Sequence, residues 1–520
     1  MGAARELVTE TGRFAKADVK FDEIKRALLS ANLLHASHGE LERFLGAEGR
    51  ELLRLLFQGH LDSRGDARAV GPVVGEDGVE RINLRKKTSR NLTTTVGKVS
   101  VPRARYEAPG VDGLHPADAE LQLPPGLYSH EVTRLIAKHA AQISFDQLII
   151  KTIDFVAETT GVAVPKRQAE QLVRDSAQDF EDFYAARPDT APPSTSAFLV
   201  MSVDQKGIVV RHQDLLPATQ KQAAAGRKLE TRFTRGETRA RKRMATVAAV
   251  YFIEPDIRDA ASVIAGLRHI TPSEPVTRPR PQNKRVWASL KRPLATVITE
   301  MFDEAQRLDP KHERPWLVLV DGDPKLEVNI RREASTRGVE ITIVLDAIHA
   351  LQYLWAAGHK LCAEGSAELE KWVLERFKRL LEGHACDVAA GMRRSATKRE
   401  LSPTQRKPID KAANYFLKRK NLMHYDLCLK AGTPIASGVI EGACRTLIGD
   451  RLDITGARWS VDGAEAVLKL RALAQSRDFD EYWTFHIERE YQRHHASKYA
   501  DDKPPGLVLS GFKPSLRAVK

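Results

Sequence analysis

The first part of the chain has apolar side chains at helical spacing. Between residues 20 and 61, Leu41, Leu45, Leu52 and Leu55 recur at intervals of three, four and seven. Such intervals place the apolar side chains on one face of a helix. The pattern predicts a helix pair that packs on a core, and a dimer interface is the alternative interpretation.

An alternating pattern replaces the helical one near residue 97. The run 99–106 (VSVPRARY) alternates, and Gly97 precedes it as a turn residue. This combination predicts a β-hairpin. Basic residues crowd the same region, so the hairpin is either a ribbon along a DNA backbone or a solvated face. These residues are Arg81, Arg85, Lys86, Lys87, Arg90, Lys98, Arg103 and Arg105.

Residues 129–184 return to helical spacing. Thr160-Gly161 interrupts the pattern, and Pro165 stands at the start of a further helix. A helix, a short turn with glycine and a helix with basic residues at its start are typical of a helix-turn-helix. Lys166 and Arg167 would then be the first side chains to meet the DNA groove. An ordinary three-helix bundle is the alternative.

The character changes after residues 186–197, which are rich in Pro, Ser and Thr and mark a boundary. Strand-like runs follow at residues 198–203, 208–211, 245–253, 316–320 and 340–345. Helical patterns cover residues 285–307, 325–335 and 439–447. Three successive strands and two more reached through helices are the order of the RNase H-like fold. Residues 350–432 are helical in pattern and predict an insertion into that fold.

We therefore expect a mixed α+β chain. An RNase H-like α/β catalytic domain, with a helical insertion before its last acidic residue, follows a mostly helical DNA-binding region with a β-hairpin. The expected segments are helices (1–70), the basic hairpin (71–120), the helix-turn-helix-like region (121–190), the first part of the core (198–349), the insertion (350–432), the final core helices (433–490) and a basic, poorly ordered tail (491–520).

A polar segment between the second and third strand-like runs contains few core residues and many arginines. It predicts an extended loop that orders on a nucleic-acid backbone, and a solvated loop is the alternative. Its candidate DNA-binding residues are Arg227, Lys228, Arg232, Arg235, Arg239, Arg241, Lys242 and Arg243.

The whole composition is basic. There are 81 Lys and Arg against 68 Asp and Glu, which gives a formal net charge of +13. Such an excess favours DNA, RNA or an anionic membrane surface as partner. The longest apolar stretch, residues 245–253, is far shorter than the roughly 20 residues of a membrane span. With four scattered cysteines and no CxxC pair, we expect reduced thiols in a cytoplasmic protein without a membrane partner.

Three acidic residues carry the candidate chemistry. Asp204 and Asp321 each follow a strand-like run, and Glu441 lies in a late helical run. Hard divalent cations take carboxylate oxygens, and two such ions can serve one phosphodiester displacement. The trio therefore predicts a site for two Mg²⁺ or Mn²⁺ ions. Asp346 ends a strand in the same manner and is a rival for the position of Asp321.

Two further residues near these acids have weaker signals. Asp323 is a second rival for the position of Asp321. His349 follows Asp346 by three positions, so both lie on one face of a helix. His349 would act near the phosphate or orient a carboxylate, and a structural histidine is the alternative.

Several blocks together resemble the Kra-type insertion-sequence transposases, which are DDE enzymes related distantly to the Mutator-like group. They are the strand with Asp204, WLVLVDGD (316–323), VLDAIHALQYLW (344–355), SGVIEGACRTLIGDRL (437–452), TGARWSVDGAEAVLKLRAL (455–473), GKVSVPRARY (97–106), LQLPPGLYS (121–129) and TGVAVPKRQAE (160–170). The likeness covers about residues 95–473. It implies an RNase H-like core whose catalytic DDE triad is Asp204, Asp321 and Glu441. The chain departs from the family in having no cysteine before Cys362.

The resemblance implies a DNA transposase of a bacterial insertion sequence. Such an enzyme binds the terminal inverted repeats, cleaves DNA with Mg²⁺ and transfers the free end to target DNA. Because two ends are handled together, we expect a homodimer or a higher assembly in the bacterial cytoplasm, associated with the nucleoid. Arg458 and Trp459 lie in a family block and are candidate DNA contacts, and a core position is the alternative for Trp459. The alternatives are a DNA-binding protein with an inert RNase H-like domain and a metal-dependent, structure-selective nuclease.

Overall fold

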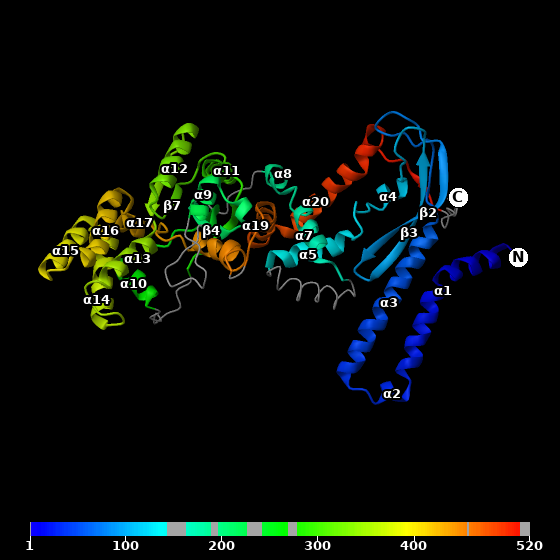
Figure 1. The fold of residues 1–520 in the computed structure, drawn as a ribbon, viewed down its shortest axis with the longest axis horizontal. Helices are drawn as coiled ribbons and strands as arrows, with labels where there is room; N and C mark the ends of the chain where they lie inside the picture. Colours follow the sequence, from blue (N-terminus) through cyan, green and yellow to red (C-terminus); the bar gives the residue numbers. More distant parts are fainter. Residues whose placement is uncertain are drawn as a thin grey trace. The chain divides into compact units, whose positions relative to one another are not determined.

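The computed structural model describes residues 2–142, 163–188, 196–225, 242–268, 278–454 and 457–509. The chain divides into two compact units (Figure 1). Unit 1 contains Met1–Ala185 together with Asp478–Lys520, and unit 2 contains Ala186–Arg477. Both units combine helices and strands, so the protein is a mixed α/β chain.

Unit 1 begins with an antiparallel pair of long helices. They are α1 (Gly2–Leu28) and α3 (His38–Arg64), joined by the short α2 (Ala31–Leu34). Ser37 and Glu40 form a capping box at the start of α3, which satisfies backbone donors there. Gly59 of α3 lies so close to Phe14 of α1 that a Cβ would approach its ring to 2.8 Å. The two helices agree with the apolar spacing of the sequence, and glycine permits their close contact.

A two-stranded ribbon follows this helix pair. Strand β2 (Asn83–Thr94) pairs antiparallel with β3 (Gly97–Glu107), as the alternating pattern predicts. Leu92 and Val99 pack against Leu61 of α3 in one cluster. The other end of the ribbon packs Tyr106 against Tyr499 from the C-terminal segment. The ribbon therefore has an apolar face on unit 1.

The C-terminal segment is more ordered than the sequence suggested. After two short turns, η4 (Ala496–Lys498) and η5 (Ala500–Asp502), strand β9 (Leu507–Val508) pairs antiparallel with β1 (Arg68–Ala69). The prediction of a poorly ordered tail from residue 491 is therefore wrong for its described part, up to residue 509. Backbone pairing and the burial of Tyr499 fix this segment, and neither has a local sequence signal.

Helix α20 (Phe479–His494) also belongs to unit 1. It contacts α8 (Phe180–Ala185), where the rings of Phe183 and Tyr482 meet edge to face with centroids 5.5 Å apart. Unit 1 further contains α4 (Pro116–Glu120), α5 (His130–Gln142) and α7 (Lys166–Asp175). The expected final core segment, residues 433–490, thus differs from the observed division after Arg477. The middle of the expected helix-turn-helix, residues 143–162, lies outside the described residues.

A buried polar network joins α20 to the segment before α8. His486 donates from Nδ1 to the Asp179 carboxylate at 2.6 Å, and Arg493 forms ion pairs with both Asp179 and Glu490. Gln178 donates to Glu490 at 2.9 Å. Burial raises the pKa of Asp179, but the hydrogen bonds and charges of His486 and Arg493 outweigh it and lower the pKa. The network therefore holds an ionised carboxylate inside unit 1.

Unit 2 is built on a five-stranded mixed sheet in the order β6-β5-β4-β7-β8. The strands are β4 (Phe198–Val209), β5 (Lys242–Ile253), β6 (Gln282–Ser289), β7 (Trp316–Val320) and β8 (Ile341–Leu345). Strand β5 is antiparallel to both β4 and β6, whereas β7 and β8 continue the sheet parallel to β4. Every residue of β7 is buried, as expected for a strand covered on both faces.

Two strands differ from the sequence prediction. The runs 198–203 and 208–211 were predicted as separate strands, but β4 is continuous from Phe198 to Val209. The start of the predicted helix 285–307 is strand β6, and the helix α11 (Leu294–Leu308) begins later. Val286, Trp287 and Ala288 are all buried next to β5. A short apolar run of this kind fits a helix and a buried strand equally well.

The remaining helices of unit 2 flank the sheet or form a separate helical group. Around the sheet are η1 (His212–Asp214), α9 (Pro217–Ala225), α12 (Pro324–Arg337), α13 (Ala347–Gly358), α18 (Gly438–Ala443), the π-helix η3 (Cys444–Gly449) and α19 (Val461–Ser476). The helical group contains α14 (Ala367–Leu381), α15 (Ala385–Lys398), α16 (Pro403–Arg419), η2 (Lys420–Leu422) and α17 (Tyr425–Ala431), and α10 (Ala260–Leu267) contacts α14 (Figure 1). In the described part of the chain, no helix has the length and apolar character needed to cross a membrane.

The buried network predicts a stability difference between two aspartates of unit 1. Asp179→Ala leaves His486 and Arg493 without their buried acceptor, so we expect a loss of about 3 kcal/mol in unfolding free energy. Urea denaturation, followed by hydrogen exchange of the α20 amides, measures this loss.

Asp182→Ala is the matched control. It removes an ion pair with Arg489 whose side chains are both about half exposed, so the expected cost is below about 1 kcal/mol. Equal losses in the two variants would contradict a stabilising role for the buried network.

Candidate metal centre

The sheet register brings Asp204 and Asp321 together. In the parallel pair β4–β7, Ser202 lies opposite Leu319. Two residues further along each strand come Asp204 and Asp321, and residues two apart in a strand lie on the same face. Asp204 does not end its strand, because β4 continues to Val209 and Asp204 remains paired with Val247 of β5. Asp204 instead stands where β4 passes beyond the end of β7.

The electrostatics of Asp321 reflect this proximity. Burial raises the pKa of Asp321, and the negative charge of Asp204 raises it further. A hydrogen bond of 2.8 Å from the backbone N–H of Asp323 to Oδ1 of Asp321 opposes this shift, as does the charge of His349. The two aspartates therefore repel each other when both are ionised, and a divalent cation between them would relieve this repulsion.

The backbone after Asp321 needs glycine. Gly322 has a φ of +86°, in the left-handed region that other residues avoid. A Cβ at this position would also lie 2.8 Å from Leu345 and 2.5 Å from Arg419. Tyr415 and Arg419 of α16 donate to the carbonyl oxygens of Asp321 and Gly322, at 2.7 and 2.6 Å. Helix α16 thus fixes the turn that carries Asp321.

Glu441 reaches the same place from α18. Three residues after Glu441 comes Cys444, whose Sγ donates to Oδ2 of Asp204 at 3.3 Å. Burial and the charge of Asp204 raise the pKa of this thiol well above its ordinary value. Cys444 also begins the π-helix η3, a rare form that is frequent at functional sites. The contact between Cys444 and Asp204 therefore holds the Glu441 helix against β4.

One cavity is lined by all three predicted acids. It has a volume of about 490 Å³, and Asp204, Asp321 and Glu441 all line it. Its other polar side chains are Lys206, Asp346, His349, Gln352, Ser437, Cys444 and Arg445. The acids come from β4, the end of β7 and α18, which are remote in sequence. The folded chain therefore places the trio around one common space.

The donor set fits a hard divalent cation. Within the described ranges, no lysine or arginine forms an ion pair with Asp204, Asp321 or Glu441. Asp204 accepts from the Gln205 N–H at 2.6 Å and from Cys444, so its negative charge has no neutralising partner among these contacts. Carboxylate oxygens without a basic partner, at the rim of a polar cavity, are the ligands that Mg²⁺ and Mn²⁺ prefer.

Asp346, the rival of Asp321, is engaged elsewhere. It is 2 % exposed, and its Oδ1 accepts from the Ile348 N–H at 2.7 Å as the N-cap of α13. Its Oδ2 accepts from the N–H and the hydroxyl of Ser437. The other rival, Asp323, caps α12 through the Lys325 N–H. His349 is half-buried in the cavity wall, close enough to influence the pKa of Asp321.

The predicted DNA-binding residues lie in several environments. Lys166 and Arg167 are exposed at the start of α7, in unit 1. Lys242 pairs with Asp453 at 2.7 Å, Arg243 is half-buried on β5, and Arg458 is exposed. The loop residues Arg227, Lys228, Arg232, Arg235, Arg239 and Arg241 lie outside the described residues.

Trp459 is a core residue, which corrects its assignment as a DNA contact. Its side chain is 8 % exposed, and the Arg451 guanidinium lies 4.8 Å from the centre of its ring. The Trp459 N–H donates to the Val209 carbonyl, and its own carbonyl accepts from the Arg211 N–H. The segment around Trp459 therefore fixes the end of β4 and leaves no indole face for a base.

Sequence reasoning missed five polar residues of the cavity, which are Lys206, Gln352, Ser437, Cys444 and Arg445. Lys206 follows Asp204 by two positions on a strand, so it shares the same face. Cys444 follows Glu441 by three positions on a helix, which also indicates a common face. Ser437 gives no such signal, because its partner Asp346 is 91 residues earlier.

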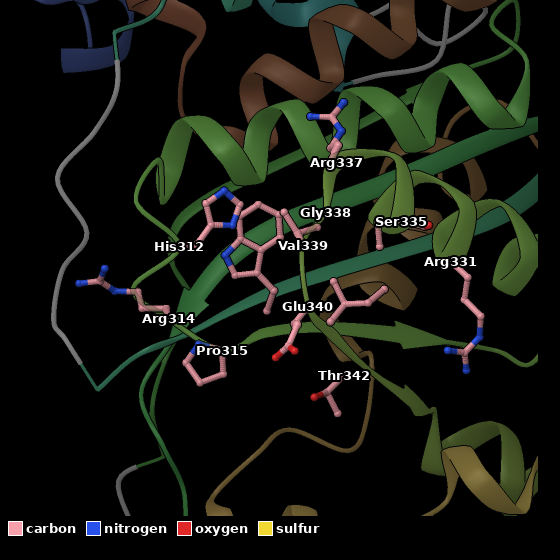
Figure 2. Close-up of a pocket in the computed structure, with 13 residues that line it drawn as sticks. His312, Arg314, Pro315, Arg331, Ser335, Arg337, Gly338, Val339, Glu340 and Thr342 are labelled. Atoms are coloured by element: carbon pink, nitrogen blue, oxygen red, sulfur yellow. The ribbon is translucent and has the colours of Figure 1, made fainter.

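Two other places in the molecule are less suited to metal or substrate. In unit 1, ligand atoms of Asp179, His486 and Glu490 lie within 4.8 Å of one another, but Arg493 already pairs with both carboxylates. In unit 2, a cavity of about 990 Å³ lies at the opposite, amino-terminal ends of β7 and β8 (Figure 2). Its arginines Arg314, Arg331 and Arg337 pair with neighbouring acids. In both places the arginines already have acidic partners.

Comparison with known proteins does not indicate a function for this chain. No protein-family model matches the sequence, and no curated protein matches it. The function therefore has to be inferred from the acids around the cavity and from the basic character of the chain.

The raised pKa of Asp321 predicts that Asp321→Asn stabilises the metal-free protein. A group whose pKa is raised on folding contributes stability that is present below its ordinary pKa and lost as pH rises through the folded value. In EDTA at neutral pH, the variant lacks this buried charge and its repulsion by Asp204, so its Tm should be higher by a few degrees.

The pH dependence provides the internal check. Near pH 4, close to the ordinary pKa of aspartate, the advantage of Asp321→Asn should shrink, since a carboxyl with a raised pKa loses charge as the pH falls. Thermal unfolding in EDTA at both pH values measures it. A Tm equal to or below that of the wild type at neutral pH would contradict the proposed repulsion.

Proposed function

We propose that this chain is a metal-dependent DNA transposase of the DDE class, similar to the Kra-type insertion-sequence enzymes. The observation that carries the proposal is the single cavity lined by Asp204, Asp321 and Glu441. These are the three residues that the family resemblance selects from the sequence. Their convergence supports a catalytic role, because three acids remote in sequence come together around one polar space.

The sheet supports an RNase H-like core as the finer description of unit 2. Its order places β4 in the centre, with β5 and β6 on one side and the parallel β7 and β8 on the other. Two acids at the middle of such a sheet and one on a later helix match the arrangement expected of that core. The helices between α13 and α18 occupy the place of the predicted insertion.

Asp204, Asp321 and Glu441 would hold two Mg²⁺ or Mn²⁺ ions. Bound there, the ions would activate the attacking oxygen and stabilise the leaving oxygen of a phosphodiester. In the first step, a water oxygen bonds to phosphorus and the bond to the 3′ oxygen breaks, which leaves a 3′-hydroxyl and a 5′-phosphate. In the second step, that hydroxyl attacks a target phosphodiester and displaces another 3′ oxygen.

Other residues of the cavity have roles that follow from their charge. Lys206 and Arg445 bring positive charge to the rim, where it attracts a phosphate backbone. His349 stands near Asp321 and is placed to exchange a proton with the reacting groups or to orient a carboxylate. Cys444 keeps Asp204 and the Glu441 helix in contact.

The partner that we propose is double-stranded DNA, as element ends and as target. The net charge of +13 supports a polyanionic partner. In unit 1, Lys166 and Arg167 are exposed at the start of α7, where a helix N-terminus adds its own attraction for phosphate. Handling two ends together calls for a dimer or higher assembly, and an insertion sequence of this kind places the enzyme in the bacterial cytoplasm.

Removal of any one acid tests the catalytic proposal. Asp204→Ala, Asp321→Ala and Glu441→Ala should each lower Mg²⁺-dependent DNA cleavage by about 100-fold or more, since even loss of an outer-shell partner costs 10- to 100-fold. Cleavage of labelled duplex DNA with and without EDTA measures this. Asp387→Ala, on the exposed surface of α15, is the control and should cleave normally.

The same assay separates the proposed function from its alternatives. Near-normal cleavage in all three acid variants would reject the site, and absence of any metal-dependent activity would favour an inert DNA-binding protein. Joining of a pre-cleaved 3′ end to target DNA distinguishes a transposase from a structure-selective nuclease, which cuts without transfer.

The basic start of α7 predicts a change in the salt dependence of binding. Replacing both Lys166 and Arg167 with alanine should lower the slope of log K against log salt by about two, because each lost phosphate contact removes about 0.9. Fluorescence anisotropy with generic duplex DNA over a KCl series measures the slope.

A control with the same change of charge uses unit 2. Lys371 and Lys378 are exposed on α14, and replacing both with alanine should leave the slope unchanged. Identical slopes in the two double variants would contradict a specific role for the start of α7.

A further inference from the structure

Asp346 is a meeting point of three elements around the candidate metal centre. Its own N–H donates to the Val320 carbonyl at the end of β7, at 2.8 Å. Its Oδ1 caps α13, the helix of His349. Its Oδ2 accepts two hydrogen bonds from Ser437, directly before the Glu441 helix. One buried carboxylate therefore ties together the segments that carry Asp321, His349 and Glu441.

The contact with Ser437 is unusual for its position. Ser437 is the N-cap residue of α18, where a serine side chain ordinarily accepts from the backbone of the first turn. Here the hydroxyl makes no such bond and donates to Asp346 instead. The N–H of Ala347 adds a backbone hydrogen bond of 2.9 Å to the Ile435 carbonyl. The start of α18 is thus anchored to α13 rather than capped by its own side chain.

We propose that Asp346, through Ser437, is the positioning residue that sets Glu441 opposite Asp204 and Asp321. The inference deepens the proposed function and rests on it. Three donors converge on the two oxygens of Asp346, and its side chain is only 2 % exposed, so we assign Asp346 to orienting a metal ligand rather than to binding the ion itself. Outer partners of this kind control ligand geometry in metal sites.

The residue type fits this task. A carboxylate can accept at both oxygens at once, which an amide cannot, because asparagine offers one acceptor oxygen and one donor nitrogen. In Asp346→Asn, either the Ile348 N–H or the Ser437 donors face the new NH₂ group. Since Asp346 is almost fully buried, water cannot replace the lost acceptor.

Binding of Mn²⁺ to the purified full-length chain tests the inference without reference to activity. Calorimetry and electron paramagnetic resonance should show two ions for the wild type and loss of one in Glu441→Ala. Ser437→Ala removes only the hydroxyl and should weaken that same ion by about tenfold. Asp346→Asn should weaken it at least as much. Ser437→Ala keeps the test decisive if the buried Asp346 variant fails to fold.

Asp259→Asn is the matched control. Asp259 is also an N-cap in unit 2, accepting from the Ser262 N–H at 2.7 Å, but it caps α10. It should leave Mn²⁺ binding unchanged. Equal binding of both ions by the wild type, Ser437→Ala and a folded Asp346→Asn would overturn the inference alone. A wild-type chain that takes up no Mn²⁺ would overturn the proposed metal site, and the inference with it.

Discussion

The parallel pairing of β4 with β7 brings the carboxylates of Asp204 and Asp321 toward each other. The contacts around this pair in unit 2 hold the two residues in place. Asp204 and Asp321 extend from buried, apolar strands whose register leaves them little freedom to separate. The repulsion is a cost that apolar burial along the sheet has to offset. Around the pair, Tyr415 and Arg419 hold the turn, and Cys444 holds the helix. The surroundings thus stabilise an arrangement that the charges themselves oppose.

The sequence contained enough information to select the three acids, because each lies in or beside an element with a clear local pattern. Asp321 follows five consecutive apolar residues, and Glu441 lies in a helical run. Strand β6 was missed because its polar first half and buried second half do not alternate, and a helix pattern follows shortly after it. The pairing of β1 with β9 was missed because it joins segments more than 400 residues apart. Local spacing therefore identified the acids but not the contacts that orient them.

The role of Asp346 illustrates the same limit in one residue. From sequence, a strand-end aspartate before a helix is a ligand candidate and an N-cap candidate at once. Only the packing of residues 435–437 against α13 shows that both oxygens are already used. Trp459 shows the opposite outcome. Its position in a family block made it a candidate DNA contact, whereas it packs against Arg451 and hydrogen-bonds to the end of β4. In both, the partner that decides the role comes from a distant segment.

The discontinuous make-up of unit 1 has a consequence for biosynthesis. Asp179 precedes unit 2 in the chain, whereas its partners His486 and Arg493 follow it. These contacts can therefore form only after the whole of unit 2 has been translated. On the ribosome, unit 2 can fold while unit 1 still lacks α20, so the apolar surface around Phe183 stays exposed. A prematurely terminated chain would carry a complete sheet with its acids beside an unfinished partner, exposed to proteolysis.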